Sequence, residues 1–187
     1  LFSALYAQES SLEYSLQKLP TAFDYIRLGH PLSCVLEWAI AKQYNLSADH
    51  VISFSSQTIP LMAILRKNAL KGRTTQIIYE GEWPAALNLD ILTSVYAYEF
   101  EVRKIEPKED IPEFDGSTIV FSDKENLDVF DTRPQVDFSI NYQSGLGSIL
   151  LVNGAHNADY ISEIQHVRRR ETIAMTPANT LSVLESV

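Results

Sequence analysis

Residues 51–70 contain a short apolar run, a polar corner and then a helical pattern. The run Val51-Ile-Ser-Phe54 is too short for a helix and predicts a buried strand. Ser55 to Thr58 are polar, and the pattern from Thr58 to Leu70 predicts a helix with Pro60 in its first turn, where proline is tolerated. A strand that turns sharply into a helix leaves free backbone N–H groups at the positive end of the helix dipole, and this geometry binds anions such as phosphate. An ordinary junction with a Ser/Thr cap is the alternative interpretation, because the corner lacks the glycines of a strong phosphate loop.

Strands and helices alternate on either side of this corner. Apolar periodicity predicts further strands at 75–79, 100–105, 117–121, 136–140 and 149–152, and helices from Pro31, at 84–98, at 157–170 and from Thr176-Pro177. This alternation predicts right-handed βαβ units, and therefore an α/β domain with a mostly parallel sheet of about six strands between layers of helices. Functional residues of such a sheet lie at the carboxyl ends of its strands, which include the corner.

The ends of the predicted domain have their own patterns. Residues 1–20 predict a helical arm with a thin apolar stripe, of the kind that often packs on a partner subunit, and residues 21–187 predict one domain. Ser144 to Gly147 predict a hairpin turn rather than a nucleotide-binding loop. Arg168 to Arg170 predict a solvated helix end, where cations suit the helix dipole.

Composition limits the partners and the compartment. The net charge of −9 argues against nucleic acid or an anionic membrane surface as the main partner. No run approaches the ~18 apolar residues of a membrane span, and the N-terminal residues lack the basic region of a signal peptide. Cys34 is the only cysteine, and we expect a buried free thiol and a cytoplasmic protein. The four histidines lack metal-ligand spacing, so no metal site is predicted.

Several short motifs follow one another in a distinctive order. They are Tyr25-Ile-Arg27-Leu-Gly-His-Pro31, Leu36-Glu37, Phe54-Ser-Ser-Gln57 and Gly72. In this order they resemble the Cys/Met-metabolism family of fold-type I pyridoxal-phosphate enzymes, which comprises the cystathionine synthases and lyases and their sulfhydrylase relatives. The resemblance covers residues 20–106 well and the rest loosely, and it implies the large domain of a pyridoxal-phosphate transferase.

The resemblance also implies a cofactor site. Ser56, Gln57 and Thr58 would form the phosphate-binding corner, with Gln57 where the family has glycine. Tyr25 and Arg27 would reach across a subunit interface to the phosphate of a neighbour, a role that suits the planar fork of arginine. A surface arginine and a packed tyrosine are the alternative interpretation of this pair.

Later in the chain the sequence departs from the family pattern. Val136 to Tyr142 can form the strand that precedes the catalytic lysine of the family, but the lysine position falls near Ser144-Gly145, and no lysine follows Lys124. Without an amine there, no internal aldimine forms and no base moves the substrate α-proton. Asp131 would be the remnant of the aspartate that pairs with the pyridine nitrogen. Only about ten residues separate Asp131 from the strand that ends at Phe121. Relative to the family pattern, a helix, with or without a strand, is therefore missing between them. The register of Asp131 against that pattern is ambiguous.

These departures leave three hypotheses. The first is a non-catalytic homologue that works as a homodimer or higher homo-oligomer, or as the partner of a catalytic relative, with no catalytic residues of its own. The second is a residual binder of pyridoxal phosphate or another phosphorylated ligand at Ser56, Gln57, Thr58 and Arg27. The third is a lyase or transferase of sulfur amino-acid metabolism whose lysine and small closing domain, expected beyond Val187, come from another chain.

Overall fold

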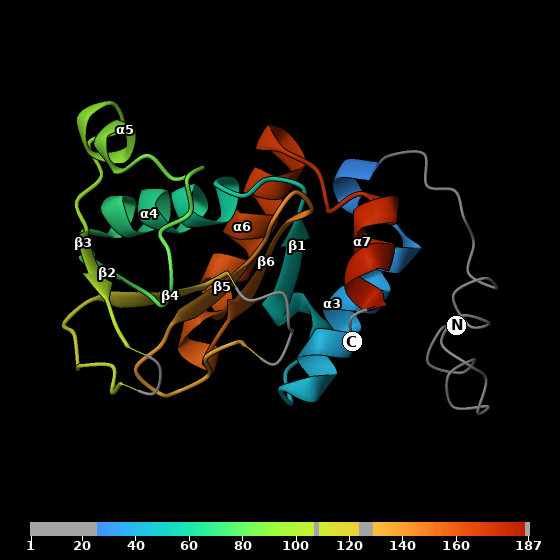
Figure 1. Cartoon of the computed structure of the whole chain (residues 1–187), viewed down its shortest axis with the longest axis horizontal. Helices are drawn as coiled ribbons and strands as arrows, with labels where there is room; N and C mark the ends of the chain where they lie inside the picture. The colour runs from blue at the N-terminus through green and yellow to red at the C-terminus, as the bar shows by residue number, and fades with distance from the viewer. Residues whose placement is uncertain (1–25, 107–108, 124–128, 186–187) are drawn as a thin grey trace.

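A single six-stranded sheet organises the computed structural model, which describes residues 26–106, 109–123 and 129–185 (Figure 1). The strands lie in the order β1-β6-β5-β4-β2-β3. Their bounds are β1 Val51–Phe54, β2 Thr75–Tyr79, β3 Glu101–Lys104, β4 Ser117–Ser122, β5 Phe138–Gln143 and β6 Gly147–Val152. Only β6 runs against its neighbours, and the other five strands share one direction. The predicted α/β domain with a mostly parallel sheet is therefore confirmed.

Two helices cover one face of the sheet. They are α4 (Ile59–Lys71) and α6 (Ala158–Glu171), which pack against each other and over the larger apolar core (Figure 1). That core includes Phe54, Ile77 and Phe138 from the sheet together with Ile164 from α6. Burial of such side chains stabilises the fold by about 1.5–3 kcal/mol each. Gly72 ends α4 in the left-handed conformation, as the sequence predicts.

Among the described residues, the helices on the opposite face lie only at its β1 and β6 end. There α3 (Pro31–Gln43) and α7 (Pro177–Leu184) pack on Val51, Ile149 and Leu151 (Figure 1). Both helices begin with proline, and the Thr176 side chain caps α7 as predicted. Over β2 and β4 this face is covered by a small cluster that loop residues complete: Ile78, Ile105, Ile111, Val120 and Val136.

The connection between β4 and β5 is short, and β4 pairs directly with β5 in parallel. Asp137 lies at the end of this connection. Its carboxylate accepts hydrogen bonds from the Thr118 N–H (2.9 Å) and Asn157 (2.8 Å), and it contacts Arg73 (3.2 Å). Burial acts to raise the pKa of Asp137, but hydrogen bonds from Asn157, Thr118 and His156, together with the charge of Arg73, outweigh it and lower the pKa. This carboxylate therefore joins α6 and the α4–β2 turn to the sheet.

Three local predictions are wrong. The helix expected at 84–98 shortens to α5 (Leu89–Ser94), because Asn88 caps a new start through the Ile91 N–H and Ala97 is left-handed. Cys34 is exposed rather than buried, since the core face of α3 is formed by Val35, Leu36 and Ile40. Arg168 is buried, as described below. The predicted arm at 1–20 lies outside the described residues.

Candidate functional site

The corner between β1 and α4 lies beside the β5–β6 hairpin. The Ser148 hydroxyl donates to the Ser56 carbonyl at 2.6 Å, and the Gln57 side-chain amide lies 3.5 Å from the Gln143 carbonyl. Gly147 makes this approach possible, because a Cβ at this position would lie 2.1 Å from the Phe54 carbonyl oxygen. The predicted hairpin turn is confirmed, and the fold brings together the predicted phosphate corner and the turn where the resemblance expects a lysine.

Ser56, not Thr58, caps α4. The Ser56 Oγ accepts the N–H groups of Thr58 (3.3 Å) and Ile59 (3.2 Å), whereas the Thr58 side chain forms no capping bond. Thr58 has helical backbone angles, which do not suit a capping residue. Pro60 contributes no N–H at all. An anion at this helix start therefore has to compete with the Ser56 hydroxyl for two amides.

A buried ion pair supports the corner from the α3 side. Glu37 Oε1 accepts hydrogen bonds from the Ser53 N–H (2.9 Å), the Ser53 hydroxyl (2.8 Å) and the Arg168 guanidinium (2.7 Å). The side chains of Glu37 and Arg168 are only 14% and 8% exposed. The pair joins α3, β1 and the end of α6. The prediction of a solvated Arg168 is wrong; its position four residues after the buried Ile164 was the signal that could have placed it on the core face.

The segment after α6 holds the corner as well. The Ser55 N–H donates to the Ile173 carbonyl at 3.1 Å, and the Ser55 hydroxyl lies 3.1 Å from the Thr172 hydroxyl. Two residues after Ile173, the Met175 carbonyl contacts the His30 ring at 2.6 Å. The corner is thus held by the segment that follows α6, and His30 holds that segment in turn.

Asp131 is not brought to the corner. Its carboxylate pairs with Arg133 at 2.5 Å, and its N–H donates to Ser139 Oγ at 3.1 Å, near the start of β5 rather than its end. The hydrogen bonds to Asp131 raise the pKa of the Arg133 guanidinium. Arg27 is exposed on a short 3-10 turn, and among the described residues it forms no hydrogen bond with the corner. Tyr25 lies outside the described residues.

The hairpin next to the corner offers no amine. Ser144 and Gly145 are exposed, and Gly145 has a φ of 71°, which L side chains rarely adopt. The lysines that the structure describes are engaged elsewhere. Lys42 lies over Trp38, Lys67 and Lys71 pair with Asp159, and Lys104 pairs with Glu82.

The described residues therefore do not fit a covalently held pyridoxal phosphate. A phosphate group that used the amides of Thr58 and Ile59 would have to displace the Ser56 hydroxyl from them. Among the described residues there is also no cluster of three or more potential metal ligands. In that same part of the chain, no helix has the length and apolar character needed to cross a bilayer.

Comparison with known proteins gives the fold. No protein-family model matches the sequence, and no curated protein matches it significantly. Solved structures do match, at low identity. Yeast cystathionine γ-lyase aligns with 88% of this chain and 52% of its own, at a TM-score of 0.60 and 12% identity. Cystathionine γ-lyase from Lactobacillus plantarum, complexed with L-serine, aligns with 90% of this chain and 56% of its own, at a TM-score of 0.57 and 11% identity.

A third match is cystathionine γ-synthase from Xanthomonas oryzae pv. oryzae, in complex with aminoacrylate and cysteine. It aligns with 90% of this chain and 56% of its own, at a TM-score of 0.55 and 10% identity. The fold is that of a pyridoxal-phosphate transferase large domain. The chain spans just over half the length of these three structures. At this identity the likeness extends to the fold, and the activities belong to those proteins.

Proposed function

We propose that this chain is a non-catalytic homologue of the transsulfuration-type pyridoxal-phosphate enzymes, and that it acts by assembling with a second copy of itself or with a catalytic relative. The observation that carries the proposal is the hairpin beside the corner, which presents Ser144 and Gly145 where the resemblance expects the aldimine lysine. A Schiff base needs an amine within bonding distance of the cofactor carbon, and these residues have none to give.

The surroundings of the hairpin support the same proposal. Asp131, the candidate partner of a pyridine nitrogen, is neutralised by Arg133 near the other end of β5. The corner meanwhile keeps its backbone shape through the contacts of Ser55, Ser56 and Ser148. Retention of the fold beside loss of the reactive groups is the pattern expected of a protein selected for assembly.

Residual phosphate binding is the second candidate function, and the half-buried polar side chains of Ser55 to Thr58 favour it. Thr58→Ala tests this cleanly, because Thr58 forms no capping bond and the cap at Ser56 stays in place. If phosphate binds at the corner, the rise in melting temperature that inorganic phosphate gives the wild type should shrink in Thr58→Ala. Thr93→Ala, on the exposed side of α5, serves as the matched control. An unchanged shift in Thr58→Ala would place any bound phosphate elsewhere.

Assembly is tested on the purified chain by light scattering at micromolar concentration. We expect the mass of at least a dimer. A monomer removes the homo-oligomer, and co-purification from the native host then tests for a complex with a catalytic relative. The proposal would be overturned if light scattering shows a monomer and no catalytic relative co-purifies with the chain. Turnover of cystathionine by the chain alone, with added pyridoxal phosphate, would overturn it from the other side and favour a lyase.

A further inference from the structure

The segment around α5 exposes an apolar patch. Five large apolar side chains are exposed in the described part of the chain, and three of them lie within six residues: Ile91 (47% exposed), Val95 (71%) and Tyr96 (47%). α5 stands at the end of the molecule opposite α3 and α7, beside the edge strand β3 (Figure 1). Single exposed apolar side chains are ordinary, whereas a group of them on one short segment is typical of an interaction surface.

The patch is held in place from below. Leu92 anchors α5 in the main core, while Ile91 and Val95, four residues apart, share a side of the helix that faces solvent. The Tyr96 ring lies parallel to that of Tyr98, with the ring centroids 5.7 Å apart, and Tyr98 packs on the same core. Apolar side chains that are already fixed lose little freedom when a partner covers them, which favours binding.

The surroundings of the patch are acidic. Residues 74–102 contain five carboxylates and no lysine, arginine or histidine. The carboxylates are those of Glu80, Glu82, Asp90, Glu99 and Glu101. Glu82 pairs with Lys104 at 3.7 Å. Asp90, Glu99 and Glu101 are exposed and form no ion pair with any residue that the structure describes.

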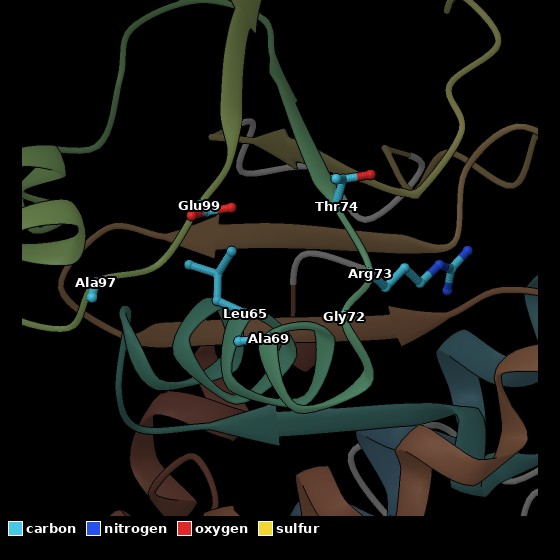
Figure 2. A pocket seen from close by; sticks show the side chains of 7 residues that line it. All are labelled: Leu65, Ala69, Gly72, Arg73, Thr74, Ala97 and Glu99. Carbon is cyan, nitrogen blue, oxygen red and sulfur yellow. The ribbon is translucent and has the colours of Figure 1, made fainter.

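Two arginines near this segment are engaged elsewhere. Arg66 pairs with Glu171 at 2.8 Å. Arg73 lines the same hollow as Glu99, but its guanidinium points away from that carboxylate and donates to Asp137 at 3.2 Å (Figure 2). The apolar patch therefore lies among carboxylates that no described cation neutralises.

We propose that the patch docks a basic segment of another protein. Apolar side chains of this segment pack on Ile91, Val95 and Tyr96, and its lysines or arginines pair with Asp90 and Glu99. Charge selects this occupant, because a second copy placed patch to patch would bring like carboxylates together, and an anionic lipid surface would meet the same repulsion. The inference does not rest on the proposed function, since it holds whether the chain is a monomer or an oligomer.

Titration of the full chain with a basic amphipathic peptide, followed by heteronuclear NMR, tests the surface. The peptide carries leucine on one helical face and lysine on the other. We expect saturable shifts of the backbone amides of Ile91, Val95 and Tyr96. A peptide with glutamate in place of every lysine should give no saturable shift at these amides, because like charges would meet.

Val95→Ser separates the patch from the general attraction of an acidic protein for basic peptides. Its affinity for the lysine peptide should fall about tenfold, since even partial burial of a valine side chain is worth that factor. Val95 is largely exposed, so this variant should keep the circular dichroism spectrum of the wild type. Leu181→Ser is the matched control: it removes an exposed apolar side chain from α7, at the other end of the molecule, and should leave the affinity unchanged (Figure 1).

Four results would overturn the inference. One is the absence of saturable shifts with the lysine peptide, and another is equal binding of the glutamate peptide. The third is an affinity for the lysine peptide that is the same in Val95→Ser and in the wild type. The fourth is a wild-type dimer, seen by light scattering, that Val95→Ser no longer forms, because it would assign the patch to a second copy of the chain.

Discussion

The Glu37–Arg168 pair gives the sharpest prediction about stability. Glu37→Ala would leave the Arg168 guanidinium almost fully buried without its counter-charge, and Arg168 Nε already lacks a hydrogen-bond partner among the described residues. It would also remove the acceptor of the Ser53 N–H and hydroxyl. Removing one partner of a buried pair costs about 3–5 kcal/mol, which is a large part of the roughly 5–15 kcal/mol that stabilises a typical domain.

Urea unfolding followed by circular dichroism measures this cost. We expect Glu37→Ala to lower the unfolding free energy by about 3–5 kcal/mol. Glu37→Gln keeps an acceptor for Ser53, so its unfolding free energy should fall by less than that of Glu37→Ala. Arg169→Met, on the exposed neighbour of Arg168, is the control and should stay within about 0.5 kcal/mol of the wild type.

The double variant Glu37→Met/Arg168→Met tests the reasoning itself. If desolvation of an unpaired charge dominates, removing both charges should cost less than Glu37→Ala alone, since buried pairs replaced by apolar groups are often neutral. This account would be refuted if Glu37→Ala lowered the unfolding free energy by less than about 1 kcal/mol. It would also be refuted if the loss in the double variant equalled the sum of the losses in Glu37→Met and Arg168→Met.

Three further predictions concern the cap, the backbone and pH. Ser56→Ala should lower the unfolding free energy by about 1 kcal/mol and Thr58→Ala by much less, because only Ser56 caps α4; equal losses in urea unfolding would contradict this. Ala97→Gly should raise the melting temperature by relieving a φ of 54°, an effect of about 0.5–1 kcal/mol; a lower melting temperature would count against it. Because the folded-state pKa of Asp137 is lowered, its contribution to stability is present above its unfolded-state pKa and is lost as pH falls through the folded-state value. The wild type should therefore lose more stability on acidification than Asp137→Asn, and parallel acid titrations of the two would disprove this linkage.

The elements that the sequence specifies locally could be predicted. Proline at the start of α3, α4 and α7 and Gly72 after α4 mark their own positions, because their backbone preferences hold in almost any tertiary setting. The corner and the hairpin could be predicted for the same reason. That they lie side by side follows from strand order, which the family resemblance implies but no local pattern shows.

The functional details depended on choices that local patterns leave open. Ser56 and Thr58 both offer a hydroxyl at the helix start, and only the backbone angles of Thr58 decide between them. Arg168 finds Glu37 across 131 residues, so its burial depends on how α6 packs against β1. The family resemblance implied that Asp131 faces a cofactor, but its carboxylate is bound by Arg133, two residues away.

Covalent capture of pyridoxal phosphate tests the central claim most directly. The purified chain is incubated with the cofactor, reduced with borohydride, digested and mapped by mass spectrometry, with a cystathionine γ-lyase treated in parallel as the positive control. We expect no lysine of this chain to carry a stoichiometric pyridoxyl group, while the control is labelled at one lysine. A single stoichiometric pyridoxyl-lysine in this chain, with a matching visible absorption band before reduction, would contradict the non-catalytic assignment.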